Sequence, residues 1–276
     1  MKIDAHQHYW NPARGDYDWM PKDDAILSRA YGPADLAGHL ARFGIEKTVL
    51  VQAAATVNET EYMLGIADAT DSVAGVVGWV DFERPQDLAQ LQRLARHPKF
   101  RGVRPMIQDI ADTDWMLRDD VQWGYRALID LDLTFDALGF PRHLANFHTI
   151  LTRYPEMRTV IDHCMKPQIR DRAFDDWAAG ISRLARDTGA CLKFSGLVTE
   201  AGDGWSIDDL KPYADHVLAA FGPDRVMWGS DWPVCQLQAS YARWHELAEA
   251  LTAHLSDDEK ARVFGGTAAE FYRLTG

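Results

Sequence analysis

Short apolar segments alternate along the chain with longer segments whose apolar residues recur every three or four positions. Eight of the short segments predict β-strands, at residues 2–8, 47–52, 75–81, 102–106, 133–137, 159–163, 191–196 and 226–230. The longer segments predict helices, for example at residues 85–96, 119–129, 144–154, 175–187 and 208–221. Such alternation is typical of parallel βαβ units.

Two of the predicted strands are almost continuously apolar, at residues 49–51 and 76–80. Strands of this kind are expected where both faces of a sheet are covered. A length of 276 residues is close to the about 250 of a (β/α)8 barrel. Open doubly wound sheets often have only about five to seven strands. We therefore predict an α/β fold, a regular or distorted TIM barrel, formed as one domain by residues 1–276.

Two further segments stand out from this alternation. Residues 9–32 are rich in Asp, Pro, Gly and aromatic side chains, and they predict a long first βα loop over the end of the barrel where such folds place their chemistry. Near the C-terminus, Ser256 and Glu259 have the spacing of a capping box. This predicts a helix that ends near Phe264, followed by a short helix at residues 267–274.

The amino-acid composition indicates which kind of partner the protein binds. The chain carries 29 basic and 41 acidic residues, a formal charge of −12, which disfavours binding to nucleic acid or to an anionic membrane. No stretch approaches the roughly 20 apolar residues of a membrane span, and the first residues do not resemble a signal peptide. We expect a cytoplasmic protein with a small-molecule partner, and free thiols at its three cysteines.

His6 and His8 end the first predicted strand. The period of two along a strand turns both imidazoles to the same side, with Asp4 one layer deeper. Two converging imidazoles can bind a metal ion or hydrogen-bond a substrate carbonyl. The alternative is a pair of solvent-facing histidines at a strand end.

Two other apolar strands also run abruptly into polar residues. One ends in Asp162 and His163, and the last ends in Asp231. Asp231 can accept a proton from water or bind a metal ion, whereas its alternative role is to cap a turn. A structural hydrogen-bonded pair is the alternative for Asp162 and His163. The ends of strands one, six and eight converge in a barrel, so these side chains predict one site.

With these three strand ends, the chain resembles the amidohydrolase superfamily, in particular its amidohydrolase-related group of TIM-barrel hydrolases, which includes lactonases of sugar acids and of 2-pyrone-4,6-dicarboxylate. The similar segments span nearly the whole chain, and they are residues 3–8, 102–105, 162–163 with 166–167, 194–197, 228–233 and 266–272. The resemblance implies hydrolysis of a sugar-acid lactone of the L-fucono or L-rhamnono type, with Asp231 as the base and His6, His8 and His163 polarising the carbonyl or steadying the oxyanion.

The resemblance also implies a metal site, formed by His6, His8, Asp231 and His163. Superfamily members with two metal ions bridge them with a carboxylated lysine, but this chain has Arg104, not lysine, on its fourth strand and no histidine on its fifth. One divalent ion, zinc by preference for these ligands, is therefore expected at most. The related pyrone lactonase works without one, and the requirement for the ion stays open.

Four more residues are candidate substrate contacts, either as hydroxyl binders or as rings that stack on a sugar: Arg104, Gln52, Trp10 and Trp232. A salt bridge on the barrel rim is the alternative for Arg104, and a structural amide for Gln52. Lys166 and Lys193 are expected at the surface. Arg104 stands alone among the predicted strand ends, which favours a neutral lactone over a dianionic pyrone.

The sequence leaves three alternatives to the sugar-acid lactonase. Two are enzymatic, a 2-pyrone-4,6-dicarboxylate lactonase and a metal-dependent decarboxylase of the aminocarboxymuconate-semialdehyde type. The third is a barrel that binds a sugar acid without turnover. The combination of three histidines with a carboxylate argues against pure binding, because a binding protein does not need a group that activates water.

Overall fold

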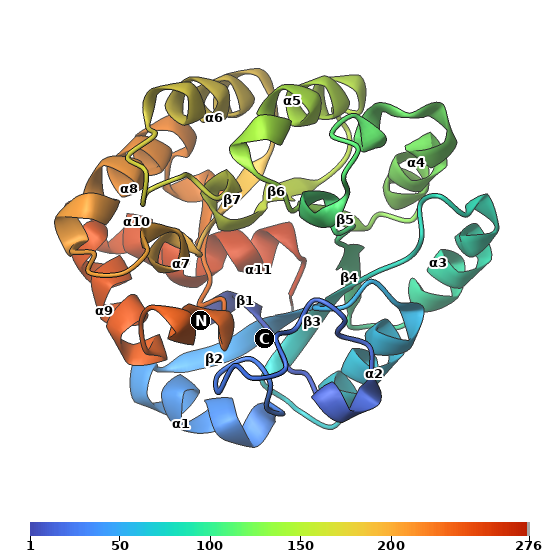
Figure 1. Cartoon of the computed structure of the whole chain (residues 1–276), viewed down its shortest axis with the longest axis horizontal. Coiled ribbons are helices and arrows are strands. Elements are labelled where there is room, and N and C mark those ends of the chain that lie inside the picture. The colour runs from blue at the N-terminus through green and yellow to red at the C-terminus, as the bar shows by residue number, and fades with distance from the viewer. Residues whose placement is uncertain (275–276) are drawn as a thin grey trace.

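A computed structural model of the chain describes residues 1–274 and forms a barrel of parallel strands inside a ring of helices (Figure 1). The strands pair in chain order. They are β1 (Lys2–Gln7), β2 (Ile45–Val51), β3 (Val73–Gly78), β4 (Phe100–Val103), β5 (Thr134–Ala137), β6 (Thr159–Ile161), β7 (Cys191–Phe194) and β8 (Val226–Trp228). The predicted (β/α)8 barrel and all eight strands are confirmed.

The barrel closes between β1 and β8 through residues at and just beyond the strand ends. Gln7 pairs with Trp232, the His8 amide donates to the Trp232 carbonyl over 2.7 Å, and the Asp231 amide donates to the His6 carbonyl over 2.8 Å. The backbone of four predicted site residues, His6, His8, Asp231 and Trp232, therefore forms the closing seam of the barrel.

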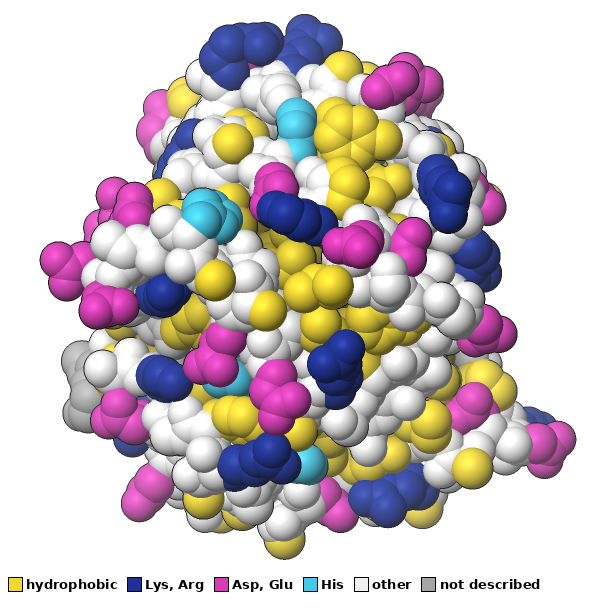
Figure 2. Space-filling model, turned by 90° about the vertical axis from the view of Figure 1, so that its left-hand side faces the viewer, with side chains coloured by type: hydrophobic (Ala, Val, Ile, Leu, Met, Phe, Trp, Pro, Cys, Tyr) yellow, Lys and Arg dark blue, Asp and Glu magenta, His cyan; other side chains and the backbone are white. Residues whose placement is uncertain are grey.

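Helices surround the strands because each has one apolar face. In the α6 helix, Trp177, Ile181 and Leu184 are buried against the barrel at spacings of three and four. The α-helices are α1 (Pro33–Phe43), α2 (Val57–Asp68), α3 (Leu88–Leu94), α4 (Gln122–Asp130), α5 (Leu144–Arg153), α6 (Asp175–Asp187), α7 (Leu197–Ala201), α8 (Ile207–Phe221), α9 (Tyr241–Leu251), α10 (Asp257–Ala261) and α11 (Thr267–Phe271). On the face shown in Figure 2, acidic and basic side chains are interspersed. Within the described residues, no helix has the length and apolar character needed to cross a membrane.

The C-terminal segment differs in part from its prediction. The capping box of Ser256 and Glu259 is present, but the helix that it opens ends at Ala261 and not near Phe264. A π-helical turn follows at Arg262–Gly266. In that turn a Cβ on Gly265 would lie 2.1 Å from the Met1 carbonyl oxygen, so the backbone packs directly against the start of β1. Gly265 itself has a φ of 175° and a ψ of −49°, so the regular α-helix is interrupted at this contact.

Candidate active site

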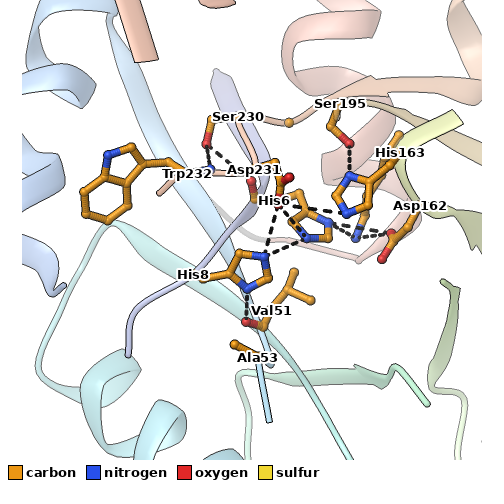
Figure 3. Close-up of polar contacts among 12 residues, drawn as sticks. His6, His8, Val51, Ala53, Asp162, His163, Ser195, Ser230, Asp231 and Trp232 are labelled. Atoms are coloured by element: carbon orange, nitrogen blue, oxygen red, sulfur yellow. Dashed lines mark hydrogen bonds and ion pairs between the residues drawn. The ribbon is translucent and has the colours of Figure 1, made fainter. Parts of the chain in front are cut away.

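His6, His8, His163 and Asp231 meet at the C-terminal end of the barrel (Figure 3). Their side chains are almost completely buried, with at most 6% exposed. The His8 Nε2 atom lies 3.2 Å from both His6 Nε2 and Asp231 Oδ1. From the same Asp231 oxygen, His6 Nε2 is 3.7 Å away and His163 Nε2 is 3.9 Å away. The predicted convergence of these four residues is therefore present in the structure.

Backbone contacts fix the two histidines of the first strand. His8 Nδ1 lies 2.7 Å from the Val51 carbonyl oxygen, which can only accept, so Nδ1 carries the ring proton and Nε2 faces the cluster as an acceptor. Beneath them, a carboxylate oxygen of Asp4 accepts from the amides of Ser230 and His6, over 2.8 and 3.2 Å. Asp4 thus lies one layer deeper, as predicted, and ties β1 to the segment that carries Asp231.

A left-handed turn positions the third imidazole. The four residues from His163 to Lys166 all have positive φ, between 47° and 58°, which L-residues rarely adopt. His163 Nδ1 lies 2.9 Å from Ser195 Oγ, and this contact leaves Nε2 facing Asp231. Asp231 itself has a φ of 54°. Unusual backbone at adjacent side chains of one cluster is typical of functional sites.

A group of buried charges lies behind the imidazoles. The Lys193 ammonium contacts Asp136 at 2.5 Å, Asp162 at 2.9 Å and His6 Nδ1 at 3.0 Å. Arg104 is paired with Asp162 at 3.2 Å. Lys193 is fully buried, so its predicted surface position is wrong, and the ion pair of Arg104 lies inside the barrel and not on its rim. No role was predicted for Asp136. Its position within a buried apolar strand, where an unpaired charge is rare, was the signal that the sequence offered.

The pKa values of this cluster are shifted by burial and by the neighbouring charges. Burial lowers the pKa of His6 and His8, and it lowers the pKa of His163 to about 4. Burial alone would raise the pKa of Asp231, but the three imidazoles hold it below its usual range. Near pH 7 the cluster therefore consists of neutral imidazoles around one carboxylate, an arrangement that can accept a proton from water.

The cluster also has the donor set of a metal site. One ligand atom from each of His6, His163 and Asp231 lies within 4.8 Å of the other two, and all three residues are buried. Two imidazole nitrogens and a carboxylate oxygen suit zinc. These three residues fit a single divalent ion, and the Nε2 atom of His8 adjoins them.

The cluster opens into a cavity of about 220 Å³. Its lining includes His8, Trp10, Trp19, Leu27, Ala53, Arg104, Met106, Gln108, Asp109, Leu138, His163, Lys166, Asp231, Val234 and Leu237. Of the predicted substrate contacts, Trp10 and Arg104 thus face this cavity. The Gln52 amide instead donates to the Arg104 carbonyl over 2.6 Å, and the Trp232 ring packs edge to face on Tyr31. A substrate role for Gln52 and Trp232 stays a prediction.

Several known proteins are similar to this chain over nearly its whole length. A family model described as amidohydrolase matches residues 3–274. The L-fucono-1,5-lactonases of Burkholderia ambifaria and Burkholderia multivorans are 43% and 37% identical to it, and each match covers 99% of this chain and 96% of the relative. The crystal structure of an amidohydrolase from Burkholderia multivorans with bound zinc is 36% identical, superimposes with a TM-score of 0.94 and covers 100% of both chains.

Proposed function

Because the chain belongs to the amidohydrolase family, we propose that it is a hydrolase that opens a sugar-acid lactone of the L-fucono-1,5-lactone type to its aldonate. The observation that carries the proposal is the convergence of three buried imidazoles on the Asp231 carboxylate, at the end of a cavity large enough for a monosaccharide lactone. The names of the two lactonases, which match nearly the full chain, support the substrate class.

In the proposed reaction, Asp231 accepts a proton as water attacks the lactone carbonyl carbon. The tetrahedral intermediate then breaks the bond between this carbon and the ring oxygen, and the proton passes to the ring oxygen, which leaves as a hydroxyl group. His163, whose Nε2 atom lies 3.9 Å from Asp231 Oδ1, steadies the oxyanion or the leaving oxygen in this proposal. No atoms beyond those of water are added.

The two histidines of the first strand have different proposed parts. His8 donates through Nδ1 to Val51, so its Nε2 atom can accept a proton or orient the water. The Lys193 ammonium donates to His6 Nδ1, which leaves the ring proton on Nε2, and this N–H can polarise the carbonyl. The sequence assigned both imidazoles to the carbonyl, and our proposal keeps that part for His6.

A zinc ion is compatible with the same site. His6, His163 and Asp231 would hold it, with His8 beside them, and the bound zinc in the Burkholderia multivorans structure supports the choice of ion. When bound, zinc supplies a water whose pKa is near 7 and polarises a carbonyl.

The cavity favours a neutral substrate over a dianionic pyrone. Among the residues described as lining it, Arg104 is the single guanidinium, and its charge is already paired with Asp162. A dicarboxylate usually needs several arginines. The assigned partner is therefore a small neutral lactone, and a cytoplasmic location remains a prediction from the sequence.

The test is a proton-release screen of aldonolactones, run with and without a chelator on the wild type and on Asp231→Asn. We expect the wild type to open an L-fucono-type lactone and the variant to lose about 10³-fold in kcat. Asp171→Asn is the matched control, because Asp171 lines only a neighbouring cavity. A wild-type rate in Asp231→Asn would remove Asp231 as the base, and release of carbon dioxide from a carboxylic acid would favour a decarboxylase.

A further inference from the structure

The left-handed turn after β6 directs a second side chain into the cavity. The Lys166 amide donates to the His163 carbonyl over 2.7 Å, which closes a turn in which positions i and i+3 lie on the same side. His163 and Lys166 occupy these two positions, and both line the cavity. The unusual backbone thus places a lysine next to an imidazole of the cluster.

Within the described residues, the Lys166 ammonium lacks the carboxylate in direct contact that Arg104 and Lys193 have. Its Nζ atom contacts the Gln108 Oε1 atom at 2.5 Å, a neutral acceptor. Within residues 1–274, no carboxylate oxygen lies within 4.0 Å of it, whereas Arg104 and Lys193 are both ion-paired. Lys166 is only partly exposed. Three carboxylates favour its charge from beyond this distance, those of Glu200, Asp231 and Asp109. A cation withdrawn from water without a carboxylate in contact is still costly, and an anion in the cavity would compensate for that cost.

We propose that the Lys166 ammonium binds the negative charge that forms at the lactone carbonyl group as the ring opens. This charge belongs first to the oxyanion of the tetrahedral intermediate and then to the carboxylate of the aldonate. The inference rests on the proposed lactonase function. Since the lactone itself is neutral, Lys166 binds the transition state and the product more tightly than the substrate, and its loss lowers kcat more than it raises KM.

The experiment compares Lys166→Met, Lys166→Arg and a matched control. We expect Lys166→Met to lower kcat about 10²-fold, to change KM by less than about threefold, and to raise the inhibition constant of L-fuconate at least about tenfold. Lys166→Arg keeps the charge and restores part of both losses. Arg170→Met removes one charge from the neighbouring cavity, which Lys166 also lines, and stays close to the wild type.

Two results would overturn the inference. One is a raised KM with an unchanged kcat in Lys166→Met, because Lys166 would then bind the uncharged substrate. The other is an unchanged dissociation constant of L-fuconate, measured by calorimetry on protein whose unfolding transition matches the wild type. The titration needs no turnover. A wild type that opens no lactone therefore refutes the proposed function, while equal or absent L-fuconate binding in the wild type and Lys166→Met refutes the role of Lys166.

Discussion

His245 shows how a single buried side chain can make the stability of this barrel depend on pH. The side chain stacks on Phe43 with ring centroids 4.2 Å apart, meets Trp228 edge to face, and is 1% exposed. Within the described residues neither ring nitrogen has a hydrogen-bond partner, although Glu249 Oε2 lies 3.8 Å from Nδ1. Burial, together with the nearby Lys2 ammonium, lowers the pKa of His245 to about 4.

The predicted consequence is a loss of stability in mild acid that His245→Phe reduces. Between pH 6.5 and about 4 the unfolded chain binds a proton at this position and the folded protein does not, so the free energy of unfolding falls as the pH falls. Removing the imidazole should decrease this fall by up to ~3 kcal/mol. Urea unfolding at several pH values in this range measures it. The same substitution at the exposed His254 should leave the slope as it is, and an equal slope in His245→Phe would contradict the prediction.

At the scale of elements, the ends of β7 and β8 carry glycines that leave room for the imidazoles. A Cβ on Gly196 would lie 2.7 Å from His163 Cβ, and a Cβ on Gly229 would lie 2.8 Å from His6 Cβ. Gly196 also has a φ of 72°, which disfavours any other residue. These two glycines therefore leave the space that the His6 and His163 side chains occupy.

Gly196→Ala is predicted to impair both folding and chemistry. The left-handed backbone costs about 1 kcal/mol, and the contact with His163 adds about 1–3 kcal/mol. Displacement of the His163 ring should lower kcat by roughly 10²-fold. Gly204→Ala is the matched control, because Gly204 has the same φ of 72° with no atom within 4 Å of its Cβ position. Urea unfolding and kcat, measured on both variants, separate the cost of the left-handed backbone from the cost of the contact with His163. Equal losses in both would show that His163 tolerates the added methyl group.

The strands of this fold are predictable from the sequence, whereas the turn after β6 is not. All eight strands were predicted because buried β-rich segments have a clear pattern, but residues 159–163 were predicted as one strand and β6 ends at Ile161. Beyond it lies the left-handed turn of His163 to Lys166, which contains no glycine or asparagine to signal positive φ. A local pattern carries no information about such a turn, because the packing around it stabilises the conformation.

The candidate site was predicted to a similar extent, and for a related reason. His6, His8, His163 and Asp231 stand where apolar strands end, so their polar character is visible in the sequence. Lys193 lies between Leu192 and Phe194 and its partner Asp136 between Phe135 and Ala137, and their pairing depends on which strands face each other across the barrel. Only the three-dimensional fold supplies this information, although two isolated charges in apolar strands indicate that a partner exists.

At the scale of the whole molecule, buried ion pairs connect distant parts of the chain. Lys193 on β7 pairs with Asp136 on β5 and with Asp162 after β6. The Tyr272 hydroxyl, after α11, donates to Asp136 over 2.7 Å and so ties the C-terminal segment to the barrel interior. Burial raises the pKa of Asp136, whereas Lys193, His6 and Arg104 outweigh the same effect of burial at Asp162 and hold its pKa well below its usual range.

Loss of the Lys193 ammonium, which pairs with both carboxylates, should therefore destabilise the whole barrel. Lys193→Met leaves two buried carboxylates short of a partner, and we expect a loss of about 3–5 kcal/mol in the free energy of unfolding. Lys193→Met combined with Asp136→Asn should recover about half of this, because the amide is neutral and still accepts from Tyr272, while Asp162 keeps Arg104. Lys211→Met, on the surface of α8, should cost less than about 0.5 kcal/mol. Urea unfolding of the four proteins forms the test. If the double variant is less stable than Lys193→Met, Asp136 stabilises the fold without its cation, and the carboxylates do not depend on Lys193 for their burial.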